Sequence, residues 1–227
     1  MKAVIRLLFK FLGIDMTKII KPPLRVQVKK PYSVEVFLAG TIDMGNSIDW
    51  QTAVGNELLQ LEMVENVFNP RRDDWDSSWV QEKSNLQFFE QVSWELDHIS
   101  RSNVIYFFFG TESKSPITML ELGKVLGSLS TYTFLTQNEK PAVVVCCEDG
   151  FYRKGNIDII CDRAGVQVFG NYESSIAELK KQIYIKHNQL CSDYGYVPLH
   201  TPYENQAVKL KNDETGRLSR IGAASNE

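Results

Sequence analysis

Hydrophobic runs of strand length alternate with helix-like segments through the middle of the chain. Because most of these runs are continuously apolar, they are typical of strands buried on both faces of a parallel sheet. The alternation with helices predicts an α/β fold with helices on both faces of that sheet. Five strands are predicted, at Val34–Ala39, Val64–Phe68, Asn103–Phe109, Pro141–Cys147 and Val166–Phe169.

Helical spacing of apolar residues separates these strands. In the segment from Asn85, Phe88, Val92 and Ile99 recur at the period of an α-helix. Ser115 followed by Pro116 is a strong helix start, because serine caps a helix and proline suits its first position. Four helices are predicted, at Ile48–Leu61, Asn85–Ser102, from Ser115 to about Gly127, and at Tyr172–Gln189.

The two ends of the chain differ from this middle part. We expect an N-terminal extension over residues 1–33, the folded domain over residues 34–192, and a polar, flexible tail over residues 193–227. Three prolines suggest that the second half of the extension is an extended lead-in. Its first fifteen residues are too short for a membrane span. They are either an amphipathic surface helix or a dispensable stretch before a second possible start at Met16.

Composition excludes several classes of protein. With 25 Lys and Arg against 28 Asp and Glu, the net charge of −3 gives no global reason to bind nucleic acid or an anionic membrane. Of the four cysteines, Cys146 and Cys147 are adjacent on a strand and point to opposite faces, so they cannot pair. Reduced thiols in the cytoplasm are the simpler interpretation. The three histidines are far apart and no C-x-x-C occurs, so no metal site is indicated.

Four polar loops follow the first four predicted strands. In an open parallel sheet the ligand binds at the carboxyl ends of the strands, where such loops converge. The loops contain neither G-x-G-x-x-G nor a Walker-type lysine motif, so no dinucleotide or triphosphate cradle is indicated. Their sequences are AGTIDMGNSIDW, NPRRDDWDSSW, GTESKSPITMLELG and CEDGFYRKGNIDIICD.

Two glutamates are candidates for chemistry. Glu121 lies about one and a half turns into the helix that starts at Ser115, where the aligned backbone dipoles favour an ionised nucleophile. The alternative is a solvated glutamate paired with Lys124. Glu95 borders the apolar stripe of the preceding helix, where a carboxylate is costly without a partner. Its alternative is an ion pair with Arg101.

The loop after the second strand suits a planar ligand. Trp75 and Trp79 can stack on a base, while Arg71, Asp73 or Asp74 hydrogen-bonds its edge. The alternative is a capped loop with solvated charges.

Cations after the fourth strand suit an anion. Arg153 and Lys154 can hold a phosphate or carboxylate, or can form a solvated turn. We expect His98, on a helix between polar and apolar positions, to be structural.

Together these segments resemble the nucleoside 2-deoxyribosyltransferase-like family. The resemblance covers roughly Val34 to Phe169 and implies a flavodoxin-like (Rossmannoid) three-layer sandwich with a five-stranded parallel sheet. The matching segments, in the order of the family, are VFLAGTIDMGNSIDWQ, NPRRDDWDSSW, EQVSWELDHI, SPITMLELG and VVVCCEDGFYRKGNIDIIC.

The resemblance implies roles for both glutamates. Glu121 would attack the anomeric carbon of a nucleoside or nucleotide and displace its base, leaving a glycosyl-enzyme ester that another base or water resolves. Glu95 would orient or protonate the base, as in retaining glycosidases. Asn156 would reach the sugar of a neighbouring subunit, which implies a homo-oligomer. No cofactor is implied. The other implied substrate-binding residues are Gly40, Thr41, Asp43, Trp50, Arg71, Asp73, Asp74, Trp75, Ser115 and Arg153.

The sequence also departs from the characterised transferases. They have an aspartate where this chain has Ser115 and a first-strand tyrosine where it has Phe37. We therefore expect cleavage of an N-glycosidic bond, with transfer of the sugar to a base or to water. The alternatives are a nucleoside 5′-monophosphate hydrolase, which Arg153 and Lys154 favour, and a non-catalytic nucleotide-binding module.

Overall fold

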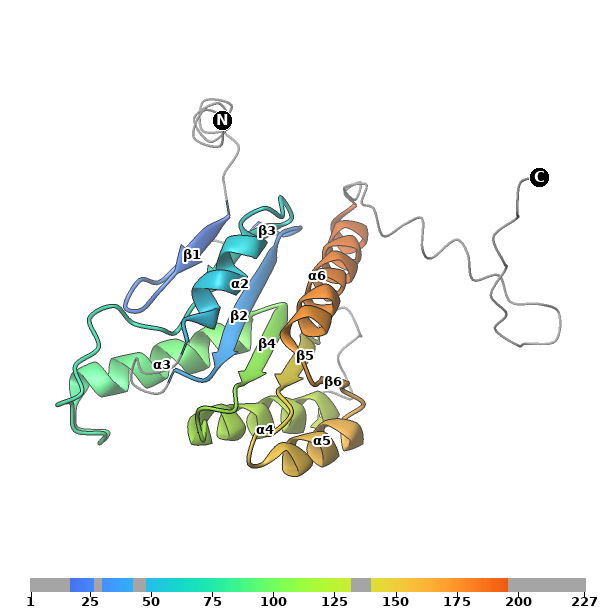
Figure 1. Ribbon diagram of the computed structural model, residues 1–227. Helices are drawn as coiled ribbons and strands as arrows, with labels where there is room; N and C mark the ends of the chain where they lie inside the picture. Colours follow the sequence, from blue (N-terminus) through green and yellow to red (C-terminus); the bar gives the residue numbers. More distant parts are fainter. Residues whose placement is uncertain (1–16, 27–29, 43–47, 132–139, 196–227) are drawn as a thin grey trace.

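A parallel sheet forms the centre of the protein. The computed structural model describes residues 17–26, 30–42, 48–131 and 140–195. Within these residues, six parallel strands form one sheet in the order β1-β3-β2-β4-β5-β6 (Figure 1). Their bounds are β1 (Lys18–Ile20), β2 (Val34–Gly40), β3 (Val64–Phe68), β4 (Val104–Phe109), β5 (Ala142–Cys147) and β6 (Val168–Phe169).

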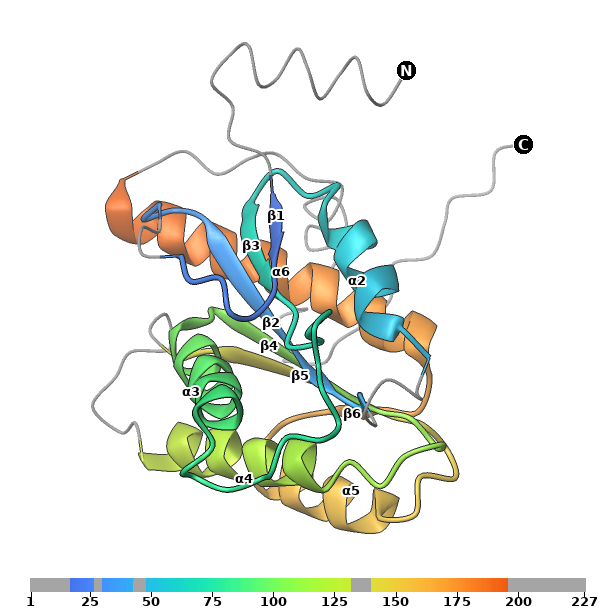
Figure 2. The same ribbon diagram turned by 90° about the vertical axis from the view of Figure 1, so that its left-hand side faces the viewer.

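Helices cover both faces of the sheet, which confirms the α/β fold. Helices α2 and α6 pack on one face, and α3, α4 and α5 pack on the other (Figures 1 and 2). The second face is rich in aromatic side chains, because β4 and α3 supply rings such as Phe107 and Trp94. The bounds are α2 (Trp50–Leu58), α3 (Leu86–Arg101), α4 (Pro116–Thr131), α5 (Lys154–Arg163) and α6 (Tyr172–Tyr194).

The strand count of five was wrong, because β1 adds a sixth strand at the edge. The five predicted strands run in the order second, first, third, fourth, fifth, which is the flavodoxin-like order. Lys18–Ile20 lies in the segment expected to be an extended lead-in and pairs with β3, Ile19 opposite Val67. Three residues are too few to show a pattern, and this strand exists because β3 offers unpaired backbone groups at its edge.

The segment after β5 was expected to be a loop, and the structure corrects this too. Its second half forms α5, which buries Ile157 and Cys161 on one face, four residues apart. Only two buried positions in ten residues give a weak helical pattern, so tertiary contact decides the helix. Helices α4 and α6 also extend to Thr131 and Tyr194, beyond their predicted ends.

Cys146 and Cys147 point to opposite faces of the sheet, as predicted. Cys146 packs against the core under α2 and α6, and Cys147 against the core under α3, α4 and α5. All four cysteines are free thiols and are buried.

The described residues contain no helix with the length and apolarity needed to cross a bilayer. The predictions for residues 1–15 and for most of the C-terminal tail lie outside the described residues.

Candidate active site

After β2 the chain continues to α2 on one face of the sheet, and after the neighbouring β4 it continues to α4 on the other face. Such a switch point leaves a crevice at the carboxyl ends of the strands, the usual ligand site of this fold class. The end of β2 is tied to β4 there, because the Thr41 N–H donates to the Phe108 carbonyl at 3.1 Å. The Gly110 N–H in turn donates to the Thr41 hydroxyl at 3.4 Å.

Gly40 and Trp50 shape this edge. A Cβ atom on Gly40 would lie 2.5 Å from the Trp50 ring and 2.6 Å from the Phe108 carbonyl oxygen, so only glycine fits. The indole N–H of Trp50 donates to the Thr41 carbonyl at 2.8 Å, and Trp50 is buried. Both residues therefore pack at the end of β2 beside Thr41, and a direct contact with substrate stays a prediction. Asp43 lies outside the described residues.

Ser115 joins the start of α4 to the same loop. Its hydroxyl lies within hydrogen-bond distance of the Thr41 hydroxyl, at 2.6 Å, and donates to the Ser113 hydroxyl at 3.3 Å. Its φ of 44° lies in the left-handed region, which costs a non-glycine residue on the order of 1 kcal/mol. Strained residues of this kind gather at functional sites, which fits the predicted role of Ser115.

Glu95 on α3 and Glu121 on α4 lie on the same face of the sheet and interact electrostatically. Burial raises the pKa of Glu95 to about 7. Burial, together with the charge of Glu95, raises the pKa of Glu121 to about 8, while Lys124 acts in the opposite direction. The expectation that the start of α4 keeps Glu121 ionised was wrong, because desolvation outweighs the helix dipole. Between pH 7 and pH 8 the pair therefore retains about one proton, and Glu121, with the higher pKa, is its preferred site.

Neither alternative ion pair forms. Arg101 donates instead to the buried Glu35, at 3.0 Å from Nε to Oε2 and 2.8 Å from Nη2 to Oε1. Within the described part of the chain, Glu121 has no ion pair with Lys124. Glu95 accepts a hydrogen bond from the side-chain amide of Gln91 at 2.8 Å. Both glutamates thus stay available for chemistry.

In the loop after β3, the two aspartates are engaged at the surface. Asp73 forms an ion pair with Lys21 at 2.5 Å, and its side chain is 79% exposed. Asp74 accepts from the Arg72 guanidinium at 2.6 Å, and Arg72 also binds Glu90 at 3.2 Å. These bonds fasten the loop to β1 and α3, so the capped-loop alternative describes both aspartates. Contact with a base stays a prediction for them.

The side chains of Arg71 and Trp75 are less exposed than those of the two aspartates. The Arg71 side chain is 18% exposed, and its Nε lies 4.0 Å from Asp49. The Trp75 ring packs 5.1 Å from the Trp79 ring, so the two indoles contact each other. Arg72 lies 5.1 Å over the Trp79 ring. Contact of Arg71 and Trp75 with a base stays a prediction.

Four of the six buried side-chain polar atoms that lack a partner among the described residues lie around this edge. They are Oε1 of Gln51 and of Gln91, Nδ2 of Asn69 and Nε1 of Trp75, while the other two belong to Asn188 and Gln189 on α6. Buried polar groups are normally paired, so such atoms fit a site that a ligand completes. The sequence reasoning missed Gln51, Asn69 and Gln91. A signal existed for Gln91, which lies one helical turn before Glu95, and for Asn69, which directly follows β3.

The cations after β5 lie at the start of α5, with Arg153 as its N-cap and Lys154 as its first residue. Arg153 is exposed, with its guanidinium 5.3 Å over the Tyr152 ring. Lys154 donates to Asp158 at 3.2 Å and to the Cys147 carbonyl at 3.3 Å. Asn156 is exposed on the same helix. An anion site here, and the contact of Asn156 with a neighbouring subunit, stay predictions.

His98 makes the contacts of a core residue. Its Nδ1 lies 2.6 Å from the Trp94 carbonyl oxygen, and its ring packs 4.4 Å from the Phe68 ring. Burial lowers the pKa of His98, so the ring is neutral near pH 7. These contacts match a structural role.

A hollow of about 460 Å³ lies at the other end of the sheet. Its lining includes Lys140 and Pro141 before β5, Gln167 before β6, and Gln182 on α6. These positions are at the amino ends of the strands, away from the switch point. We therefore place the candidate site at the paired carboxyl groups and not in this hollow.

A known protein family matches the part of the chain that contains the candidate site. The family described as nucleoside 2-deoxyribosyltransferase like matches residues 33–151, just over half of the chain. The match runs from the start of β2 to the end of β5 and contains both glutamates. No curated protein matches the chain.

Proposed function

The chain belongs to the nucleoside 2-deoxyribosyltransferase-like family, and from this membership we propose that it is an enzyme that cleaves the N-glycosidic bond of a nucleoside or nucleotide. The observation that carries the proposal is the electrostatic coupling of Glu95 and Glu121, two carboxyl groups with raised pKa values on neighbouring helices. One ionised and one protonated carboxyl group are what a retaining glycosyl transfer requires.

The first step starts from the form of the pair in which Glu95 carries the proton and Glu121 is ionised, which is the less populated form because Glu121 has the higher pKa. In this form Glu121 attacks the anomeric carbon of the sugar. A bond forms between a carboxylate oxygen and that carbon, while the bond from the carbon to the base nitrogen breaks and its electron pair stays on the base. The protonated Glu95 donates its proton to the departing base, which leaves neutral. The product is a glycosyl ester of Glu121 and a free base.

In the second step water or another base attacks the anomeric carbon of the ester. The ionised Glu95 accepts the proton that this nucleophile loses, and Glu121 departs as a carboxylate. The cycle returns both carboxyl groups to their starting protonation states. Transfer to a base and hydrolysis thus differ only in the acceptor.

A nucleoside 5′-monophosphate is the second candidate substrate. The edge of the site carries the hydrogen-bonded hydroxyl groups of Thr41 and Ser115, which are neutral donors. Neutral hydroxyl groups can donate hydrogen bonds to an anionic group at the sugar 5′ end without charge repulsion. In this variant water is the acceptor.

We further propose that the protein acts in the cytoplasm as a homo-oligomer. The exposed side chain of Asn156 on α5 is available to a neighbouring subunit, and all four cysteines are free thiols. Light scattering of the purified protein tests the oligomer, and a monomer at all concentrations would exclude the shared site.

A chromatographic screen tests the proposed function. The protein is incubated with ribo- and deoxyribonucleosides and their 5′-monophosphates, with and without free adenine or cytosine. We expect release of a base from at least one substrate. Release that requires an added base indicates a transferase, and release with free sugar indicates a hydrolase. Calorimetric binding of a nucleotide with no base release would favour the non-catalytic module instead.

The pH dependence of the reaction follows from the shared proton. Below pH 7 both carboxyl groups are protonated and Glu121 cannot attack, and above pH 8 both are ionised and Glu95 cannot protonate the base. We expect a bell-shaped profile of kcat/KM with its maximum between these values. Glu95→Gln should remove the alkaline limb and lower kcat by about 10²–10⁴-fold. A flat profile from pH 6 to pH 9 would contradict the role of the pair.

A further inference from the structure

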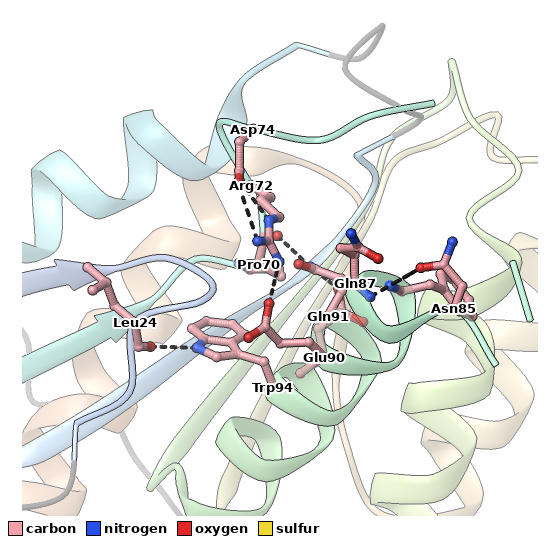
Figure 3. A network of polar contacts seen from close by, with 11 residues as sticks. Leu24, Pro70, Arg72, Asp74, Asn85, Gln87, Glu90, Gln91 and Trp94 are labelled. Carbon is pink, nitrogen blue, oxygen red and sulfur yellow. Dashed lines mark hydrogen bonds and ion pairs between the residues drawn. The ribbon is translucent and has the colours of Figure 1, made fainter. Parts of the chain in front are cut away.

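Gln91 connects the loop after β3 to the carboxyl group of Glu95. It is 4% exposed and lies on α3, one turn before Glu95. Its Nε2 donates to the Pro70 carbonyl at 3.0 Å and to Glu95 Oε1 at 2.8 Å. Figure 3 shows Gln91 between Pro70 and the helix, beside the ion pair of Arg72 and Glu90.

The Pro70 carbonyl decides which way the Gln91 amide faces. A backbone carbonyl only accepts hydrogen bonds, so the NH₂ group, and not the oxygen, must lie between Pro70 and Glu95. The second N–H of that group then points at Glu95 Oε1, which must act as an acceptor. A proton on Oε1 would point toward this N–H, and two donors cannot form a hydrogen bond with each other. The proton of a neutral Glu95 is therefore directed to Oε2.

We infer that Gln91 is a positioning residue that places the acidic proton of Glu95 on Oε2 and holds that carboxyl group toward the departing base. The inference rests on the proposed function for its catalytic meaning. The contact itself rests on geometry alone. Because Pro70 lies in the loop that carries Arg71 and Trp75, the same amide ties the acid to the predicted base pocket.

The charged groups around Glu95 are few among the described residues. From α4, Glu121 interacts with it, and the charge of Lys124 acts on Glu121. On α3 itself, Arg101 is bound to Glu35 and Glu90 is bound to Arg72. Gln91 donates the hydrogen bond that favours ionisation of Glu95 and lowers its pKa, against the effect of burial. Removal of this amide should therefore raise the pKa of Glu95.

A titration tests the contact without any reaction. In Gln91→Met, a residue of similar length replaces the amide, and carbon NMR follows the carboxyl carbon of Glu95. We expect its midpoint to move upward by about 0.5–1 pH unit. Gln87→Met is the matched control, because Gln87 is exposed on the same helix, and its midpoint should not move. An unchanged midpoint in folded Gln91→Met would overturn the inference.

A second experiment separates positioning from a general loss of structure. A purine that is methylated at N7 is already cationic and leaves as a neutral base without a proton from the enzyme. For the purine substrate that the wild type cleaves, Gln91→Met should lower kcat about 10-fold with little change in KM. For its N7-methylated form the loss should stay within about twofold.

Equal losses on both substrates would show a merely structural role for Gln91 and overturn the inference. Gln87→Met should match the wild type on both substrates. A wild-type protein that releases no base from any nucleoside or nucleotide of the screen would refute the proposed function and the catalytic meaning of Gln91 with it. The NMR titration would still report the contact, so the two failures are distinguishable.

Discussion

Glu121→Gln is expected to lower the rate of base release by at least about 10³-fold, because a neutral amide cannot form the glycosyl ester. The measurement is base release by chromatography under single-turnover conditions. Mass spectrometry of the acid-quenched wild type should find the mass of the sugar on the peptide that contains Glu121. Glu112→Gln is the control, because Glu112 is exposed in the loop before α4. Base release at the wild-type rate from Glu121→Gln would refute the nucleophile.

The same variant should not be less stable than the wild type. The pKa of Glu121 is higher in the folded protein, about 8, than its ordinary value of 4.5. A folded state that binds the proton more tightly loses stability as pH rises from about 4.5 through 8. The Gln side chain does not titrate, so at pH 9 the variant should be more stable by on the order of 2–4 kcal/mol. Urea denaturation at pH 5 and pH 9 measures this difference, and lost activity then cannot be ascribed to unfolding.

Arg101→Met is expected to lower the free energy of unfolding by about 3–5 kcal/mol, because it removes the ion pair that Arg101 makes with the buried Glu35. Glu35 is 0% exposed in the centre of the sheet. Asn66 also donates to it at 2.9 Å, and the Arg101 guanidinium lies 5.4 Å over the Phe68 ring. Arg101 further donates to the Val26 carbonyl. Urea denaturation at neutral pH measures the loss.

Two further variants show whether the loss of this buried ion pair is the cause. Arg25→Met breaks the exposed pair of Arg25 and Asp97, whose side chains are 45% and 59% exposed, and should cost no more than about 1 kcal/mol. Combining Arg101→Met with Glu35→Leu should recover most of the lost stability, because no buried charge remains. If Arg101→Met costs as little as Arg25→Met, the buried pair does not stabilise the fold as argued.

The sequence predicted the central strands well, because a strand buried on both faces must be apolar along its length. The prediction for Val64–Phe68 has the observed bounds, and Asn85 caps α3 through its side chain, as the predicted helix start requires. The two missed elements, β1 and α5, lie at the edges of the fold. Their residues are only partly apolar, and neighbouring elements supply the contacts that make them regular.

The candidate site was predicted only in part. Helical spacing showed that Glu95 and Glu121 each border an apolar face, but it could not show that the two helices bring them together. The pairing of Arg101 with Glu35, which frees Glu95, joins residues 66 positions apart and has no local signal. The contact of Gln91 with Pro70, 21 positions apart, is of the same kind.

Local residue patterns therefore decided the strands, most of the helices and the set of acidic residues that belong at the carboxyl edge. The protonation states of those residues depend on the tertiary structure. A carboxyl group responds to how much water surrounds it and to which charge is nearest, and both depend on side chains from other elements. For Glu121 the burial and the charge of Glu95 raise the pKa to about 8 despite its place near the start of α4, which is why a glutamate expected to be ionised favours its protonated form at neutral pH.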